Sequence, residues 1–146
     1  MKIRIAKKED FEQYLELNRK SLREYSKISL QKIPINNKKI KKEFDFIFKN
    51  QRRFMLVSEE NRIITGYLIW ILLTDTFQKT GYVDDLFIKK EFRKKGIAKE
   101  LIKKFIKVAK NKGVKKFRLN VNVKNKKAIK LYNKFGFKIT HYEMQK

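Results

Sequence analysis

Several residue types are rare or absent from the sequence, which has no cysteine, one proline, one histidine and five glycines among 146 residues. Without cysteine there can be no disulfide framework, no thiolate metal site and no covalent cysteine intermediate. The lone histidine, His141, has no second histidine beside which to bind a metal, so we predict no metal site. The chemistry of this chain must therefore rest on carboxylates, phenols, amines and backbone groups.

Long apolar runs are also missing. The longest, Tyr67 to Leu73, is far shorter than the ~20 residues that a membrane-spanning helix needs. The first residues, Met1 to Ile5, alternate like a strand and do not resemble a secretory signal. We therefore expect a soluble, cytoplasmic protein without a membrane span. Its length predicts a single domain, residues 1–146.

Acidic residues are scarce relative to basic ones. Fifteen Asp and Glu stand against 39 Lys and Arg, which leaves a formal charge of +24. Such an excess favours anionic partners, of which coenzyme A and nucleic acid are the two obvious classes. A lysine-rich surface that serves no specific polyanion explains the same composition, so association with nucleic acid or the ribosome stays an open alternative.

Apolar periodicity predicts alternating helices and strands. Asp10 and Gln13 suggest a capping box at the start of a first helix that ends near Tyr25. Ile40, Phe44, Ile47 and Phe48 mark a second, lysine-rich helix. Two further helices are expected at 96–111 and 125–135, and strands at 1–5, 53–58, 62–72, 82–88, 117–123 and 137–144. The predicted order is β-α-α-β-β-β-α-β-α-β, a mixed α/β or α+β fold.

The stretch Val83 to Ala98 joins a strand pattern to a helix pattern through a short basic loop. Unpaired N–H groups and the helix dipole make such a corner suitable for an anion. Gly96 allows close approach to the backbone, and Arg93, Lys94 and Lys95 add positive charge. No Walker loop or dinucleotide fingerprint is present. On its own, the loop is equally consistent with a basic turn before an ordinary surface helix.

Two motifs resemble those of the GNAT superfamily of acetyl-CoA-dependent N-acyltransferases. Arg93 to Ala98 matches the pattern Arg/Gln-x-x-Gly-x-Gly/Ala, and Asn125 to Phe137 matches Asn-x-x-Ala-x-x-x-Tyr-x-x-x-Gly-Phe. The order of elements is similar to that of the family along nearly the whole chain. The resemblance implies a mixed, mostly antiparallel sheet with helices on both faces, acetyl-CoA as cofactor and an amine as acceptor.

The resemblance also implies a binding site for acetyl-CoA. Its pyrophosphate is expected at the loop and helix start, formed by Arg93, Lys94, Lys95, Gly96, Ile97 and Ala98. Its pantetheine arm is expected along the end of the preceding strand, formed by Leu86, Phe87 and Ile88. The Leu86 N–H corresponds to the donor that holds the thioester oxygen, where negative charge develops during attack. Asn125 and Tyr132 complete the expected contacts with the cofactor.

Asp84 and Asp85 are the candidates for the base that takes a proton from the amine. Neighbouring strand residues point to opposite faces unless a bulge intervenes, so one of the two is expected to face the thioester. By analogy with acidic pairs in some polyamine and aminoglycoside acetyltransferases, we favour Asp84. The alternative is that both acids are structural, one paired with a lysine and the other lining a cleft.

Tyr132 matches the family tyrosine that protonates the departing thiolate. A phenol with a pKa near 10 is suited to that role. The alternative is a core aromatic packed against Phe135 and Phe137. Because the chain lacks a cysteine nucleophile, we expect direct transfer in a ternary complex.

The sequence does not identify the acceptor. The sequence continues for only nine residues after Phe137, so we expect an open acceptor cleft that suits a protein or peptide amine, although a small-molecule amine remains open. A nucleic-acid-binding protein or an acyl-CoA sensor without transferase activity is the rival interpretation. A monomer and a homodimer are equally compatible with the sequence.

Overall fold

A five-stranded sheet forms the centre of the computed structural model, which describes residues 1–144. The strands lie in the order β1-β2-β3-β4-β5, and all neighbours are antiparallel except the parallel pair β4 and β5. Their bounds are Lys2–Ile5 for β1, Arg53–Glu60 for β2, Ile63–Thr74 for β3, Lys79–Ile88 for β4 and Val114–Leu119 for β5. The expected mixed, mostly antiparallel sheet is confirmed.

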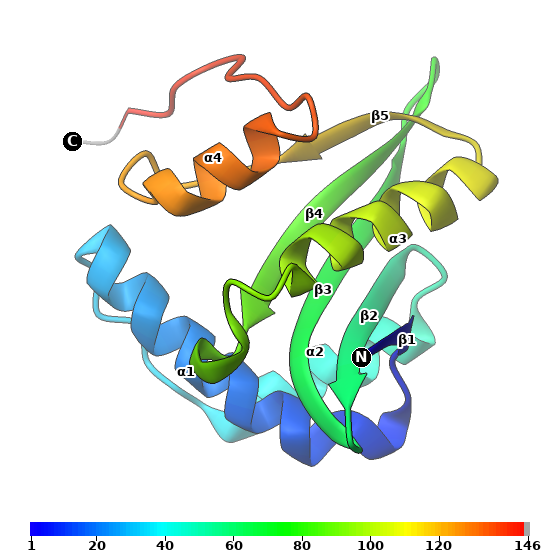
Figure 1. The fold of residues 1–146 in the computed structure, drawn as a ribbon. Coiled ribbons are helices and arrows are strands. Elements are labelled where there is room, and N and C mark those ends of the chain that lie inside the picture. The colour runs from blue at the N-terminus through cyan, green and yellow to red at the C-terminus, as the bar shows by residue number, and fades with distance from the viewer. Residues whose placement is uncertain (145–146) are drawn as a thin grey trace.

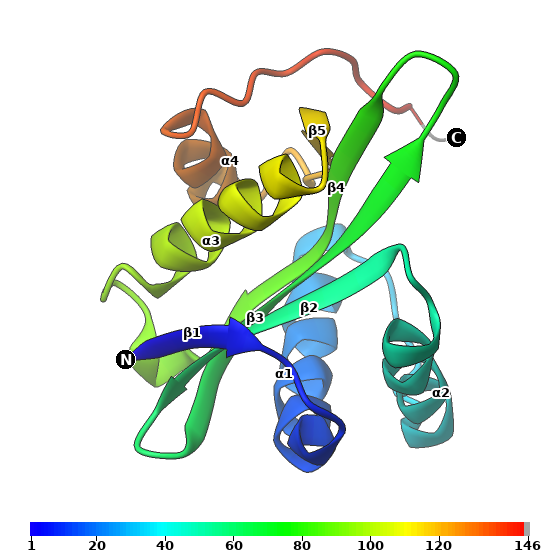
Figure 2. The ribbon, with the colours of Figure 1, turned by 90° about the vertical axis from the view of Figure 1, so that its right-hand side faces the viewer.

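Four α-helices cover the two faces of this sheet. They are α1 (Phe11–Ser29), α2 (Asn37–Lys49), α3 (Ile97–Asn111) and α4 (Lys126–Asn133), with short 3-10 turns at Lys8–Asp10 and Lys90–Phe92. Figures 1 and 2 show α1 and α2 on one face and α3 and α4 on the other. Within residues 1–144, no helix combines the length and apolar character needed to cross a membrane.

Each face of the sheet has its own apolar core, because successive strand residues point in opposite directions. On β3, Tyr67 contributes to the core beneath α1 and α2, whereas its neighbour Leu68 contributes to the core beneath α3. Phe44 of α2 and Phe105 of α3 are fully buried at the centres of the two cores. The sheet is therefore covered on both faces, and a polar ligand can reach its main chain at the ends of the strands.

The last predicted strand, 137–144, is wrong. A strand needs a neighbour that takes up its backbone hydrogen bonds, and here the chain turns back onto α4 instead. The Phe137 N–H donates to the carbonyl oxygen of Tyr132 at 3.2 Å, and the two rings pack with centroids 5.7 Å apart. The observed order ends with α4 rather than with a sixth strand.

Two other boundaries differ from the predictions. The strand expected at 117–123 begins at Val114 and ends at Leu119. A turn follows it, in which the carbonyl oxygen of Asn122 accepts from the Asn125 N–H at 2.8 Å. Helix α1 runs to Ser29, four residues beyond the predicted end.

The predicted capping box at the start of α1 is also wrong. The Asp10 side chain does not cap the helix and instead accepts hydrogen bonds from Arg4 at 2.7 and 2.8 Å. The Gln13 side chain reaches the β2–β3 hairpin, where it accepts from the Ile64 N–H at 2.8 Å. Both side chains hold α1 to the sheet rather than to its own first turn.

Candidate active site

The parallel pair β4 and β5 separates part of the way along β4. Their ladder begins at Lys79 and Val114 and ends at Val83 and Leu119, whereas β4 stays paired with β3 as far as Ile88. Figure 1 shows the two strands diverging beyond this point. Within residues 1–144, the edge of β4 from 84 to 88 thus has no strand neighbour on the β5 side. Such an edge can pair with an extended ligand.

A β-bulge lies where the strands separate. Ile69 of β3 pairs with Asp85 and the next residue, Trp70, pairs with Val83, so Asp84 is the extra residue of β4. A bulge bends the strand and redirects its side chains. The bulge, which we allowed above as an exception to the alternating directions of neighbouring side chains, is therefore present.

The two acids at the bulge have different surroundings. Asp84 is exposed and lies 3.4 Å from the guanidinium of Arg53. Asp85 is partly buried and accepts a hydrogen bond of 2.6 Å from the Tyr67 hydroxyl. The pKa of Asp85 is raised to about 6, and burial is the largest cause. Hydrogen bonds from the Tyr67 hydroxyl and the Leu86 N–H oppose this rise in pKa, whereas the Asp84 charge adds to it. Asp85 is then mostly ionised at neutral pH and still able to accept a proton.

A buried polar chain supports Asp85 from the side of α1. The Asn18 amide nitrogen donates to the hydroxyl of Tyr67 at 3.3 Å and to that of Tyr14 at 3.1 Å. Both tyrosines are buried, and burial raises the pKa of each, with the Asp85 charge as the next cause. The Tyr67 hydroxyl stays protonated and remains a donor to Asp85.

Tyr132 lies on α4 and is buried, with 8% of its surface exposed. Burial raises the pKa of its phenol, and the negative charge of Asp85 raises it further. The phenol therefore stays protonated at neutral pH. Its ring also packs against Phe137, so packing and a role in proton transfer are compatible.

The turn from β4 to α3 exposes a run of backbone N–H groups. Lys94 and Gly96 take left-handed conformations, with φ of 63° and 78°. The first main-chain hydrogen bond of α3 is donated by the Glu100 N–H to the carbonyl oxygen of Gly96, at 3.1 Å. Within residues 1–144, the backbone N–H groups of 94–99 donate no main-chain hydrogen bond. A Cβ built on Gly96 would meet nothing within 4 Å, so the space in front of the turn is open.

Arg93 fixes this turn to two other elements. Its Nε donates to the carbonyl oxygen of Ile88 at 2.8 Å, and its terminal nitrogen lies 2.8 Å from both carboxylate oxygens of Glu24 on α1. The guanidinium also lies over the ring of Phe87, 5.3 Å from its centroid. Its side chain is thus engaged within the protein, while Lys94 and Lys95 remain exposed.

The other predicted site residues lie around this corner. Asn125 caps α4, as predicted, by accepting from the Ala128 N–H at 3.2 Å. Ile97, the first residue of α3, is buried, and Ala98, which follows it, is partly buried. Sequence reasoning missed Tyr67, Asn18 and Glu24, because each acts through a contact with a residue at least 18 positions away.

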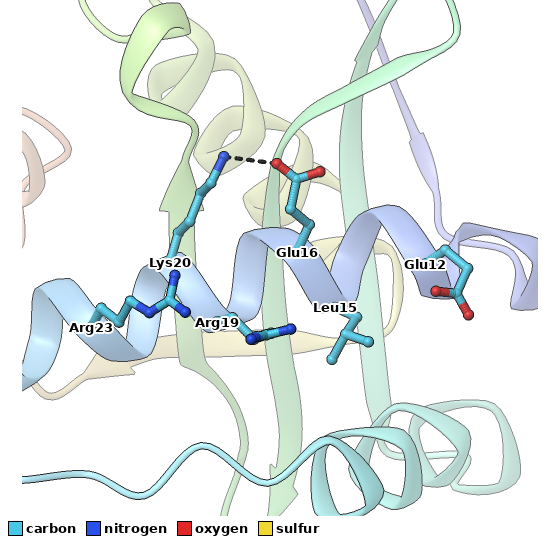
Figure 3. A pocket seen from close by; sticks show the side chains of 6 residues that line it. All are labelled: Glu12, Leu15, Glu16, Arg19, Lys20 and Arg23. Atoms are coloured by element: carbon cyan, nitrogen blue, oxygen red, sulfur yellow. Dashed lines mark hydrogen bonds and ion pairs between the residues drawn. The ribbon is translucent and has the colours of Figure 1, made fainter.

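A shallow hollow on α1 is separate from this arrangement. Figure 3 shows it lined by Glu12, Leu15, Glu16, Arg19, Lys20 and Arg23, with Lys20 paired to Glu16. At 3.6 residues per turn, these side chains project from the side of α1 opposite Tyr14 and Asn18. The hollow is formed by one helix and does not open toward Asp85.

The chain is similar to known proteins in sequence. The sequence profile described as the acetyltransferase (GNAT) family matches residues 11–137. The chain is 33% identical to thialysine N-epsilon-acetyltransferase of Sus scrofa over 143 residues, which cover 92% of this chain and 82% of that protein. It is 30% identical to an uncharacterized N-acetyltransferase of Methanocaldococcus jannaschii over 92% of its own length but spans only 59% of that relative.

Solved structures show the same fold at lower identity. A Bacillus halodurans protein superposes with a TM-score of 0.85 at 22% identity, covering 99% of this chain and 98% of the other. An aminoglycoside N-acetyltransferase solved in complex with CoA gives a TM-score of 0.80 at 16% identity, covering 99% and 97% of the two chains.

Proposed function

Because the chain belongs to the GNAT family of acetyltransferases, we propose that it moves an acetyl group from acetyl-CoA to a primary amine by direct attack in a ternary complex. The observation that carries the proposal is the meeting of three features at one corner. These are the unpaired edge of β4 beyond Val83, the free amides of 94–99 and the ionisable carboxylate of Asp85.

The residues at this corner fit the donor. The amides of 94–99 would bind the pyrophosphate at the start of α3, where the helix dipole favours negative charge. Leu86 and Ile88 would offer main-chain hydrogen bonds along the pantetheine arm. Acetyl-CoA supplies a thioester whose carbonyl carbon accepts the amine and whose thiolate departs. The open space in front of Gly96 supports this assignment, because a bulky side chain there would obstruct it.

Asp85 would remove the proton from the attacking amine. A lysine-like amine has a pKa of ≈ 10.4 and must lose a proton before its lone pair can attack. A carboxylate with a pKa of about 6 is a stronger base than an ordinary one and is still ionised at neutral pH. Asp84 is the weaker candidate, because it is exposed and paired with Arg53. This proposal reverses the preference drawn from the sequence.

Leu86 and Tyr132 would assist at the oxygen and the sulfur of the thioester. The Leu86 N–H, which lies beside the Asp85 carboxylate, would hold the thioester oxygen as it becomes negative. The phenol of Tyr132 stays protonated up to high pH and would give its proton to the departing thiolate. Within this scheme, no covalent intermediate on the protein is needed.

The acceptor we propose to test first is the side-chain amine of thialysine. The support is the 33% identity to a thialysine N-epsilon-acetyltransferase across 82% of that enzyme. Asp84 and Asp85 would attract a cationic amine to a site on an otherwise basic protein. A peptide amine is the second class to test.

Two measurements test the proposal. CoA release should depend on both acetyl-CoA and the amine, with thialysine, lysine, spermine, an aminoglycoside and a short peptide compared side by side. Calorimetry should show acetyl-CoA binding without an amine present. Binding of acetyl-CoA with no turnover of any of these amines would favour a sensor, and acetylated protein in the intact mass spectrum during turnover would exclude direct attack.

A further inference from the structure

The positive charge is distributed unevenly along the chain. Residues 1–91 contain 20 Lys and Arg with 13 Asp and Glu, which leaves +7. Residues 92–146 contain 19 Lys and Arg with only Glu100 and Glu143 as acids, which leaves +17. A chain that is simply rich in lysine would show no such division, so the composition of the second part calls for its own explanation.

The second part folds onto one side of the molecule. It forms α3, β5 and α4, and Figure 2 shows both helices on the face of the sheet opposite α1 and α2. All 18 Lys and Arg described between 92 and 144 are exposed. Arg93 pairs with Glu24 and Lys103 pairs with Glu100. We call the part of this region formed by the exposed lysines of α3 and α4 the basic surface: Lys99, Lys103, Lys104, Lys107, Lys110, Lys126, Lys127, Lys130 and Lys134.

Helical spacing arranges these lysines in rows. Lys99, Lys103, Lys107 and Lys110 recur every three or four positions, so they form a single row on α3 that faces away from the core. At 1.5 Å per residue, the row is roughly 16 Å long. Lys126, Lys130 and Lys134 form a similar, shorter row on α4. Rows of this length match a linear polyanion better than a single small anion.

A shallow hollow lies between the two helices along the α3 row. It is lined by Lys103, Lys107 and Lys110, with Ile106, Asn111 and the aromatic ring of Phe135 from the end of α4. Ammonium groups around an apolar, partly aromatic lining suit a polynucleotide, whose phosphates meet the charges while a base rests on the ring. The hollow begins more than one turn beyond the amides proposed to bind acetyl-CoA, so it is a separate place.

We propose that the basic surface of α3 and α4 binds the phosphate backbone of a nucleic acid. Its charge complementarity follows from the density of phosphates, because duplex DNA carries one charge per ≈ 1.7 Å of its axis. Binding of this kind depends on counterion release and tolerates many sequences. It requires neither acetyl-CoA nor an amine, so its outcome is independent of the proposed transferase reaction.

The test is fluorescence anisotropy with a short labelled RNA single strand and a short DNA duplex across a range of salt concentrations. The variant Lys103→Gln/Lys107→Gln/Lys110→Gln removes three charges from the lining of the hollow. If each lysine neutralises one phosphate, the slope of log K against log salt becomes shallower by about 2 for the single strand and about 3 for the duplex. Affinity at low salt should fall by roughly tenfold to a hundredfold.

A matched control removes the same charge elsewhere. Lys38→Gln/Lys42→Gln/Lys49→Gln changes three exposed lysines of α2, on the opposite side of the sheet. This control should keep the wild-type slope, and both variants should keep the wild-type affinity for acetyl-CoA in calorimetry. Equal weakening by the two variants would overturn the proposal, because net charge would then explain the binding. Salt-insensitive binding, or binding to anionic lipid vesicles and not to nucleic acid, would overturn it as well.

Discussion

Asp85 and Asp84 are adjacent in sequence, yet the bulge gives their carboxylates unlike environments. One accepts a hydrogen bond from a buried phenol, and the other faces solvent beside Arg53. A general base contributes about 10²- to 10⁴-fold to rate. We therefore expect Asp85→Asn to lower kcat by about that factor and Asp84→Asn to lower it by less than tenfold.

Steady-state kinetics with the best amine check this prediction, and calorimetry with acetyl-CoA controls for the donor site. Both variants should bind acetyl-CoA normally. A large loss in Asp84→Asn together with a small loss in Asp85→Asn would restore the assignment drawn from the sequence.

Tyr67 is a positioning residue for Asp85. Its hydroxyl lowers the pKa of the carboxylate, against the larger effect of burial and the smaller effect of the Asp84 charge. The other ionisable groups that interact with Asp85 are the phenols of Tyr14 and Tyr132. Tyr67→Phe should raise the pKa of Asp85, so that the acid limb of the kcat/KM profile moves to higher pH by about one unit.

The control for Tyr67→Phe is Tyr14→Phe, which removes a buried hydroxyl bonded to Asn18 but not one bonded to Asp85. Its acid limb should coincide with that of wild type. A purely structural role for Tyr67 would lower the melting temperature and leave the midpoint of the acid limb unchanged.

At the scale of elements, the Arg93–Glu24 ion pair joins α1 to the turn that precedes α3. Glu24 holds Arg93, which in turn bonds the last carbonyl of β4. Exposed ion pairs are worth about 0–1 kcal/mol, so Glu24→Gln should weaken acetyl-CoA binding by about twofold to fivefold. Calorimetry measures this change, and Glu43→Gln on α2 serves as the control. An unchanged affinity in Glu24→Gln would mean that the turn keeps its shape without α1.

A second cluster ties β1, β2 and the start of α1 together. Arg4 donates to Asp10 at 2.7 and 2.8 Å and to Glu59 at 2.6 Å. Burial acts to raise the pKa of Asp10, but the hydrogen bonds from Arg4 and the Lys7 N–H outweigh it, and the pKa is lowered. Removing Arg4 leaves this buried carboxylate without its partner, so Arg4→Met should cost about 3 kcal/mol of unfolding free energy at pH 7.

The effect of Arg4→Met should depend on pH. A carboxyl whose folded pKa is depressed stabilises the fold above its unfolded pKa of ≈ 3.9 and loses that contribution as the pH falls through the lower folded value. Urea unfolding at pH 7 and near pH 3 should therefore show a difference between wild type and variant that narrows in acid. A constant difference would assign the loss to packing of the Arg4 side chain.

Local sequence signals predicted most elements but not those that depend on a distant neighbour. The start of α3, its end near Gly113 and the Asn125 cap follow from residues next to one another, and all three are observed. The stretch expected as a strand at 137–144 begins with alternating apolar and polar residues, Phe137 to Thr140, yet alternation cannot supply a partner strand. The local sequence predicts that Asp10 caps a helix, whereas in the structure its carboxylate pairs with Arg4.

The candidate site divides in the same way. Motif spacing located the turn at 93–98 and placed Tyr132 on the fourth helix, because both lie within short stretches of chain. The bulge that separates the roles of Asp84 and Asp85 arises from the register between β3 and β4. Tyr67 lies in a continuous apolar run of the sequence, and only the packing of α1 and β4 around it reveals its hydroxyl as a partner for Asp85.

At the scale of the whole molecule, the first and second parts of the chain differ in charge and in proposed role. Residues 1–91, which include α1 and α2, contain 13 of the 15 acids and supply the polar chain to Asp85. Residues 92–146, which include α3 and α4, carry +17 of the net charge of +24. An acceptor amine is cationic before it reacts, so the acids at 84 and 85 offer it a local attraction that the far side opposes. Salt screens both interactions, so KM for a cationic amine should rise with salt if the acids at 84 and 85 dominate and fall if the basic side dominates. KM for a neutral amine should change little, and a salt series with paired amines measures that balance.

The uneven placement of charge across the sheet gives the protein a large permanent electric dipole. Because the sequence pI is ≈ 10.2, the molecule stays cationic in mildly alkaline buffer. We expect it to approach a negatively charged resin with its α3 and α4 side oriented toward the resin. Retention on a cation exchanger should thus depend on which face a neutralised lysine comes from, and two variants of identical net charge should elute apart.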